Sequence, residues 1–263
     1  MQLEQAQIVS QQRCSGDYWL MELAAPEIAA TVQPGQFVHL RISRRRDLVL
    51  RRPFSVFKAS DGKIWILYKR VGKGTAAMAT LAAREWVSLI GPLGRGFPMQ
   101  LDGRFPVIVA GGYGVAPLAF LAERLVRTGV VFIGAKTTDD LLCDGCFARK
   151  GWEVYLATED GARGQRGLVT ELLDTWLAGR GEIRPIFYAC GPDGMLRAVA
   201  ERALNLEAPA WISLDRRMGC GVGACLTCVQ RVRLADGRET WARVCKEGPV
   251  FEAREIVWDA TEQ

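Results

Sequence analysis

The sequence predicts a β-barrel, then an α/β domain with a parallel sheet, and finally a small cysteine-bearing domain. Three observations lead to this fold class. Strands and turns alternate at short intervals over the first hundred residues, strands and helices alternate from Phe105 onward, and residues 219–228 hold three cysteines among glycines. We expect the domains to span residues 1–100, 101–212 and 213–263. A chain of 263 residues is long enough for two such cores and a small module.

The first hundred residues contain short strand-like segments separated by turns. Pro34-Gly35 and Asp61-Gly62 mark two of the turns, and one alanine-rich helix, GTAAMATLAA, begins at Gly74-Thr75. Closely spaced strands of this kind are typical of an antiparallel barrel. The expected strands are DYWLMEL, GQFVHLRI, PFSVFK, GKIWILYKR and REWVSLI.

The alternation of strand and helix after Phe105 predicts a parallel sheet covered on both faces. FPVIVAGG is a continuous apolar strand, and APLAFLAERLVRTG is an amphipathic helix that ends at Gly129. The last fifty residues hold the cysteines and a hairpin that turns at Asp236-Gly237. The remaining expected elements are VVFIGAK, a helix near residues 138–149, WEVYLAT, GLVTELLDTWLAG, PIFYACG and MLRAVAERALN.

Composition places the chain among ordinary globular proteins. Hydrophobic residues make up 49% and charged residues 24%. No apolar run reaches the roughly 18 residues that a membrane helix requires. The segment MQLEQAQIVS lacks the basic flank and apolar core of a signal peptide. We therefore expect a cytoplasmic protein without a membrane partner.

The arginine-rich stretch 41–52 is the one candidate for a nucleic-acid surface. Aromatic residues are not interleaved there as platforms on which bases could stack. A solvated strand end or an anionic cofactor is the better interpretation, so we expect no nucleic-acid partner. The single histidine, His39, excludes most catalytic triads and histidine metal sites. Val38, Leu40 and Ile42 alternate with it, which predicts a half-exposed strand histidine.

The cysteine spacing carries the strongest chemical signal. Cys220-x4-Cys225-x2-Cys228, with sixteen further residues before Cys245, is the plant-type ferredoxin arrangement that holds a 2Fe–2S cluster. The glycines between the cysteines let backbone N–H groups approach the cluster and offset its charge. Structural zinc is the alternative, but zinc sites usually pair two C-x2-C knuckles and only one is present. Eight cysteines in a reducing compartment favour metal or redox chemistry over disulfides.

Three motifs in the first domain favour a flavin: RRPFS, VGKGT and GPLGRGF. Arg52 could supply a charged fork for a pyrophosphate, and Ser55 could bond to the flavin ring or ribityl chain. Gly74 and Thr75 lie at a helix start, where free N–H groups suit a phosphate. The structural alternative is a glycine-capped helix with two ordinary turns.

Two strand-to-helix switches in the second domain favour a dinucleotide. In VIVAGGYGVAPL, Pro117 stands where a dinucleotide loop usually has its third glycine. In FYACGPDGML, Cys190 could contact nicotinamide or be a buried thiol. Lys136 and Arg163 are the nearby cations, but acidic residues surround them, which favours NAD over NADP. The candidate nucleotide residues are Gly111, Gly112, Gly114, Cys190, Gly191 and Pro192.

CDGC, residues 143–146, is a possible second redox motif. A redox dithiol usually lies at a helix N-terminus near a strand end. This pair is expected in or beside a helix, which favours structural cysteines.

These motifs follow one another along the chain in the order found in the ferredoxin–NADP reductase superfamily, and the resemblance covers nearly the whole chain. The tail MGCGVGACLTCVQRV…RVCKEGPVFEAREI is similar to the electron-transfer subunits of NAD-linked dihydroorotate dehydrogenases. CDGC is foreign to that pattern, and Lys136 replaces an arginine often found there. By this resemblance FAD would contact Arg52, Pro53, Phe54, Ser55, Leu67, Tyr68, Lys69, Gly74 and Thr75.

The resemblance implies an oxidoreductase without acid–base catalytic residues, because the flavin does the chemistry and the protein positions it. It implies FAD, a 2Fe–2S cluster and NAD, and an FMN-containing catalytic partner in a heterotetramer that serves pyrimidine biosynthesis. One alternative is a reductase subunit for an NAD(P)H-linked ferredoxin, polysulfide or hydrogenase complex. An alternative of another class is a zinc-stabilised binding module that senses nucleotides.

Overall fold

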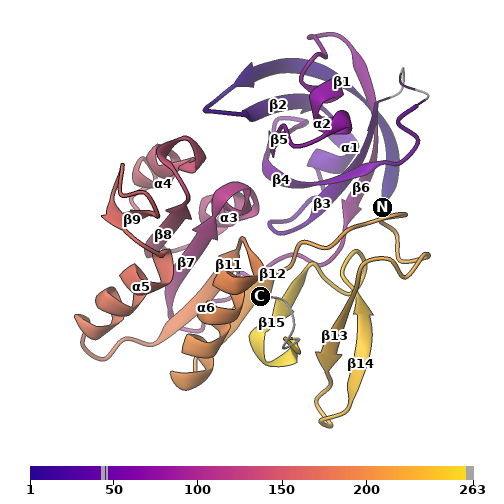
Figure 1. Ribbon diagram of the computed structural model, residues 1–263. Helices are drawn as coiled ribbons and strands as arrows, with labels where there is room; N and C mark the ends of the chain where they lie inside the picture. The colour runs from indigo at the N-terminus through magenta and orange to yellow at the C-terminus, as the bar shows by residue number, and fades with distance from the viewer. Residues whose placement is uncertain (43–44, 46, 259–263) are drawn as a thin grey trace.

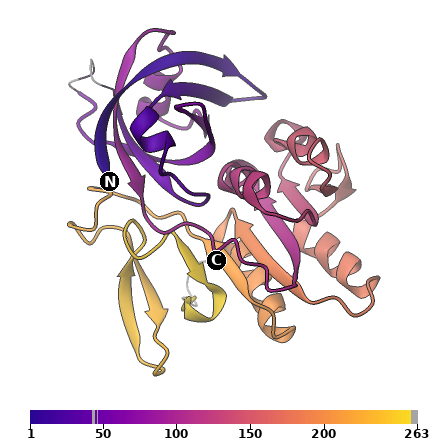
Figure 2. The same ribbon diagram turned by 180° about the vertical axis from the view of Figure 1, so that it is seen from behind.

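The structure is a computed structural model that describes residues 1–42, 45 and 47–258. A barrel, a layered α/β domain and a C-terminal hairpin domain lie against one another (Figures 1 and 2). Among the described residues no helix has the length and apolar character needed to cross a membrane. The antiparallel barrel and the sheet of parallel strands confirm the predicted fold class.

Six antiparallel strands close the barrel in the order β1-β2-β5-β4-β3-β6. The apolar side chains of alternate residues fill its interior, as Val38, Leu40 and Ile42 of β3 illustrate. Sequence reasoning missed the first strand, whose polar residues hide an alternation of buried Glu4, Ala6 and Ile8. The elements are β1 (Gln2–Arg13), β2 (Tyr18–Ala24), α1 (Pro26–Ala29), β3 (Phe37–Ile42), β4 (Arg52–Ser60), β5 (Lys63–Lys69), α2 (Lys73–Met78) and β6 (Trp86–Leu93).

The second sheet has the order β10-β9-β8-β7-β11-β12-β15. Its strands run parallel except for the last, β15, which pairs antiparallel with β12. The strands are β7 (Phe105–Gly111), β8 (Val130–Ala135), β9 (Glu153–Thr158), β10 (Gln165–Arg166), β11 (Pro185–Cys190), β12 (Ala210–Ser213) and β15 (Val250–Glu252).

Helices cover both faces of this sheet (Figure 1). Val107 and Val109 of β7 belong to the apolar core on the α5 and α6 side, whereas Ile108 and Ala110 belong to the core on the α3 and α4 side. A strand buried on both faces reads as a continuous apolar run, which is why FPVIVA was recognisable. The helices are α3 (Val115–Arg124), α4 (Asp144–Ala148), α5 (Val169–Ala178) and α6 (Asp193–Asn205), with 3-10 turns η1 (Gly112–Gly114) and η2 (Thr138–Asp140).

Two predicted helices are shorter than expected. The helix of GTAAMATLAA ends at Met78, where the Thr80 hydroxyl donates to the Ala77 carbonyl and competes with the helical bond. The helix expected near residues 138–149 is divided into η2 and α4. Cys143 separates the two pieces, because its φ of 64° lies in the left-handed region that a helix cannot accommodate.

The C-terminal domain contains the hairpin of β13 (Val229–Arg233) and β14 (Glu239–Arg243), β15, and the 3-10 turn η3 (Ala253–Glu255). Gly237 has a φ of 84°, as the predicted turn at Asp236-Gly237 requires. β15 pairs with β12 at the edge of the second sheet. Residues Val250–Glu252 therefore belong to that sheet, although they follow the hairpin in sequence.

The prediction that His39 is half-exposed is wrong, because the residue is 0% exposed. The alternation along β3 was read correctly, since Val38 and Leu40 point into the barrel. The outer face that His39 shares with Phe37 is covered by the C-terminal domain, which lies too far away in sequence for a strand pattern to reveal.

Candidate functional site

A cavity of about 270 Å³ lies between the barrel and the second sheet. It brings together residues that lie up to about 200 positions apart in the sequence. Ten predicted residues line it: Arg52, Pro53, Phe54, Ser55, Leu67, Tyr68, Lys69, Thr75, Gly114 and Cys190. Sequence reasoning missed the other nine lining residues, which come from more than one domain: Phe37, Val71, Tyr113, Ala116, Ser213, Leu214, Asp215, Met218 and Pro249.

The barrel wall of the cavity is aromatic. Phe54 of β4 and Tyr68 of β5 meet edge to face, with ring centroids 5.9 Å apart. Burial raises the pKa of Tyr68 far above its ordinary value, so its hydroxyl stays protonated. Flat apolar rings beside a protonated hydroxyl suit a planar heteroaromatic ring such as a flavin.

Arg52 and the start of α2 form a cationic corner at the start of β4. A Cβ atom built on Gly74 would lie 1.7 Å from Arg52 Nε, so the guanidinium group rests directly on that glycine. The Thr75 hydroxyl accepts from the N–H groups of Val71 and Gly72, at 2.9 and 3.1 Å, and holds the turn in place. The corner combines a charged fork with a glycine that allows close approach, which fits a phosphate.

Lys69 links the barrel to the second domain. Its Nζ atom lies 2.6 Å from Asp140 Oδ1, and its ammonium group lies over the Tyr18 ring. The Tyr18 hydroxyl donates to the same carboxylate at 2.8 Å. The two domains are therefore joined by charge and hydrogen bonds beside the cavity.

The two predicted glycine loops of the second domain pack against each other. A Cβ on Gly111 would meet Pro192 Cδ at 2.6 Å, and one on Gly114 would meet the Cys190 carbonyl oxygen at 2.3 Å. Gly191 faces Gly111 at similarly short range, and Gly112 has a φ of 53°. These positions need glycine because the ends of β7 and β11 approach so closely, at the carboxyl edge where α/β sheets bind ligands.

Cys190 lies where this edge meets the cavity. Burial raises the pKa of its thiol to about 12, so the sulfur is neutral near pH 7. Burial also raises the pKa of Asp215, which accepts from the Tyr113 hydroxyl at 3.3 Å. A neutral thiol at this position can contact a ring but is a poor nucleophile.

The four predicted thiols lie together as two pairs. Cys220 interacts through its side chain with Cys225, and Cys228 does so with Cys245, whose N–H donates to Cys228 Sγ at 3.4 Å. In the described part of the chain no three His, Cys, Asp or Glu side chains converge as a single metal ion needs. Each iron of a 2Fe–2S cluster takes two thiolates, so the two pairs of cysteines fit this cluster.

The backbone of residues 219–228, here called the cysteine loop, stabilises negative charge on the sulfur atoms. The N–H groups of Val222 and Ala224 donate to Cys220 Sγ at 3.4 and 3.2 Å. These bonds outweigh burial and lower the pKa of Cys220, while the Thr227 hydroxyl lowers the pKa of Cys225 to about 6. In contrast, burial raises the pKa of Cys245 to about 12. The first pair therefore holds the more acidic thiols, and the thiolate is the form that binds iron.

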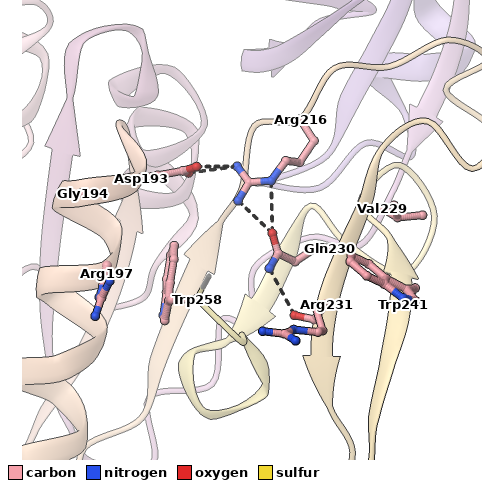
Figure 3. Close-up of a pocket in the computed structure, with 9 residues that line it drawn as sticks. All are labelled: Asp193, Gly194, Arg197, Arg216, Val229, Gln230, Arg231, Trp241 and Trp258. Carbon is pink, nitrogen blue, oxygen red and sulfur yellow. Dashed lines mark hydrogen bonds and ion pairs between the residues drawn. The ribbon is translucent and has the colours of Figure 1, made fainter. Parts of the chain in front are cut away.

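Arg216 fixes the C-terminal domain to α6 (Figure 3). Its guanidinium group donates to both Asp193 carboxylate oxygens, at 2.9 and 2.8 Å, and to Gln230 Oε1. Gln230 in turn donates to the carbonyl oxygens of Arg231 and Val257. Arg216 lies four residues before Cys220, so its hydrogen bonds anchor the N-terminal end of the cysteine loop.

The arginine-rich stretch does not form one described surface. Ser43, Arg44 and Arg46 lie outside the described residues. Arg45 pairs with Asp47, and Arg51 donates to the Ser88 carbonyl and hydroxyl oxygens.

CDGC begins a helix rather than lying within one. Cys143 is the N-cap of α4, and the Cys146 N–H donates to its carbonyl oxygen at 2.8 Å. Cys143 thus lies beside the helix and Cys146 within it, as expected, and the pair is at the helix N-terminus that redox dithiols usually occupy. The thiol of Cys143 and the nearby Arg149 lower the pKa of Cys146 to about 6, and Arg163, one of the two cations weighed for a 2′-phosphate, pairs with Asp144.

We expect iodoacetamide to modify Cys146 with a half-maximal rate near pH 6. A lowered pKa means that the thiolate persists above that pH and that labelling falls as the pH drops through it. In Cys143→Ala the midpoint should rise towards the value of a free thiol, about 8.5. Mass spectrometry of the tryptic peptide measures this rate. Cys190 is the internal control, since burial raises the pKa of its thiol to about 12, and a Cys146 midpoint above 8 would contradict the expectation.

Solved structures share this architecture. The chain matches the structure of an NADH-dependent reduced ferredoxin–NADP oxidoreductase, studied for flavin-based electron bifurcation, with a TM-score of 0.83, 26% identity, and coverage of 96% of this chain and 90% of that one. A ferredoxin NADP+ reductase from Neisseria gonorrhoeae, with bound FAD and NADP, matches 77% of this chain and 91% of its own at a TM-score of 0.66 and 16% identity. The fold and site define a flavin- and iron–sulfur-dependent oxidoreductase of the ferredoxin–NADP reductase type.

Sequence relatives narrow the class. Residues 215–257 match the family model "Iron-sulfur cluster binding domain of dihydroorotate dehydrogenase B". The dihydroorotate dehydrogenase B (NAD(+)) electron transfer subunit of Desulforamulus reducens is 39% identical, over 92% of this chain and 93% of that protein. The subunit of the same name from Bacillus caldolyticus is 39% identical over 97% and 98%. The chain belongs to this family of electron transfer subunits.

Proposed function

We propose that this chain accepts electrons from a partner that oxidises dihydroorotate at its own FMN and delivers them to NAD+, in the de novo synthesis of UMP. The family membership supports this reading. When bound, a 2Fe–2S cluster carries single electrons and FAD pairs them as the hydride that NAD+ accepts, so the path needs both groups.

One observation carries the proposal: the cavity and the cysteine loop adjoin. Met218 lines the cavity and lies two residues before Cys220. Gly114 and Cys190, which also line the cavity, belong to the glycine loops of the second sheet. A flavin in the cavity would therefore adjoin both the proposed nicotinamide site and the proposed cluster site.

The chain's residues would bind and orient these groups without acting as acids or bases. Arg52, with Gly74 and Thr75, would hold the FAD pyrophosphate, and Ser55 would bond to the flavin ring or ribityl chain. The other FAD contacts would be Pro53, Phe54, Leu67, Tyr68 and Lys69. NAD would lie along Gly111, Gly112, Gly114, Cys190, Gly191 and Pro192. The cluster ligands would be Cys220, Cys225, Cys228 and Cys245.

The name of the family implies a catalytic partner subunit. We infer that the partner contains FMN, that two copies of each chain form a heterotetramer, and that the complex is cytoplasmic. Support for a partner near the cysteine loop comes from its exposed apolar side chains: Leu226 is 64% exposed and Val222 is 37% exposed. We also keep the division into residues 1–100, 101–212 and 213–263 as a proposal.

The test is a mild anaerobic affinity purification from the native host. The eluate is assayed for orotate formed from dihydroorotate with NAD+ as the acceptor. We expect NADH and orotate in equal amounts, and a second chain that contains FMN at a one-to-one ratio. Mass photometry then measures whether the complex is a heterotetramer.

A yellow-brown eluate that oxidises NADH but forms no orotate would overturn the pyrimidine role. It would favour a reductase subunit for ferredoxin or polysulfide, in keeping with the likeness to the ferredoxin–NADP oxidoreductase. A colourless eluate would overturn the flavin and iron–sulfur assignment as well, because zinc has no visible absorption.

A further inference from the structure

His39, the only histidine, is not among the residues that the proposed function uses. It lies on the outer face of β3 and is 0% exposed. Burial of a polar ring is costly unless the ring is hydrogen-bonded, so its surroundings need an explanation.

The ring of His39 contacts the cysteine loop. Its Nδ1 atom lies 3.2 Å from the carbonyl oxygen of Cys220. A carbonyl oxygen can only accept a hydrogen bond, so Nδ1 carries the hydrogen and donates it. The barrel is thereby bonded to the backbone of a proposed cluster ligand.

Gly221, the next residue, is shaped to this ring. Its φ is 72°, and a Cβ built on it would lie 2.4 Å from His39 Nδ1 and 2.8 Å from His39 Cε1. Contacts that short do not occur, so the loop reaches its position only because residue 221 has no side chain. The ring and the glycine therefore determine how closely the loop approaches the barrel.

The same strand forms part of the flavin cavity. His39 pairs with Pro53 of β4, and Pro53 lines the cavity together with Arg52. Phe37, on the same face of β3, lines the cavity and also packs in the core that contains Cys228 and Cys245. One strand thus contacts both proposed redox sites.

We propose that His39 is a positioning residue that fixes the cysteine loop against the flavin-binding barrel and so sets the separation of the two redox centres. The inference rests on the proposed cofactors but not on the identity of the partner. Arg216 anchors the chain before the loop to α6, and Arg243 of β14 donates to the Gly223 carbonyl at 2.8 Å, whereas His39 bonds the loop to the barrel.

The test uses the isolated chain with its cofactors, reduced anaerobically by NADH in a stopped-flow instrument. Flavin bleaching and cluster reduction are followed at separate wavelengths, and the reduced cluster is recorded by EPR. In His39→Leu we expect flavin bleaching at the wild-type rate and cluster reduction slowed by more than about threefold, because the rate of electron transfer falls exponentially with the separation of the two centres. The EPR spectrum should shift as well.

His39→Asn is the matched rescue variant. Its side-chain amide nitrogen can occupy the place of Nδ1 and donate to the Cys220 carbonyl, so cluster reduction should stay within about threefold of wild type. It also removes Nε2, a buried atom for which the described residues offer no hydrogen-bond partner. Val38→Ala controls for a weakened barrel, since Val38 is the neighbouring buried residue on the interior face. It should leave the EPR spectrum unchanged.

Wild-type spectra and rates in His39→Leu would overturn the proposal. Equal damage in His39→Asn and His39→Leu would also overturn it, and so would a spectral shift in Val38→Ala. If His39→Leu does not fold, the comparison of His39→Asn with Val38→Ala decides. Because NADH is the only reductant, a failed orotate assay would leave this result interpretable.

Discussion

Replacement of Cys225 by alanine should abolish turnover from dihydroorotate to NAD+ and leave NADH oxidation by a small dye intact. As a proposed ligand, Cys225 would contribute one thiolate to the cluster, and its loss would leave an iron with an incomplete ligand set. Loss of outer-shell partners already costs about 10- to 100-fold in metal affinity, so loss of a ligand should exceed about 100-fold. Dye reduction at the flavin does not need the cysteine loop. Both activities are measured on the same anaerobic preparation of the two-subunit complex.

Cys14→Ala is the matched control, because Cys14 is exposed and directly follows β1, beside Cys146 of CDGC. It should leave both activities and the iron content at the wild-type level. Simultaneous loss of both activities in Cys225→Ala would mean that the cluster is needed for folding, or that the dye takes its electrons there. Circular dichroism of the variant separates these two explanations.

Replacement of Arg52 by alanine should weaken FAD binding by about 10- to 100-fold. Hydrogen bonds to charged groups contribute about 1.5–3 kcal/mol each, and Arg52 provides the charged fork beside α2. Gly74→Ala should have a similar effect, because its new Cβ would displace the guanidinium group. Flavin fluorescence during reconstitution of the apoprotein measures the dissociation constant.

Arg197→Ala removes the same side chain from the surface of α6 and controls for net charge. It should bind FAD as wild type does. Arg52→Lys should be intermediate, since it keeps the charge but loses the planar fork. Wild-type affinity for FAD in Arg52→Ala would contradict the proposed phosphate contact. The bond from Arg52 to the Leu50 carbonyl would then be its observed structural role.

Local chemistry made part of this site predictable. Cys220, Cys225 and Cys228 lie within nine residues, so their sulfur atoms must be close together in any fold of the rest of the chain. Gly111 and Gly114 follow a strand that is apolar on both faces, so their place at the edge of a parallel sheet could be read directly. Arg52 and Gly74 were recognised as separate motifs, and the structure places them in contact.

Long-range packing explains what the sequence analysis missed. Tyr113, Asp215 and Met218 line the cavity from segments that show no motif, and their approach depends on how two domains meet. The pattern around His39 predicted its face correctly, but nothing local shows that a loop 181 residues away covers that face. The two-residue strand β10 and the three-residue strand β15 are too short for a periodic pattern.

The antiparallel pairing of β15 with β12 has a consequence for how the protein is made. On the ribosome the second sheet remains open along the β12 edge until Val250–Glu252 emerges, after the barrel, the other strands of the sheet and the cysteine loop have been synthesised. An unpaired apolar edge can recruit other chains, and Trp211 and Ile212 would lie on it. Nascent chains that stall or terminate before Val250 should therefore depend on chaperones and enter inclusion bodies, even though they contain every residue of the barrel and of the cysteine loop.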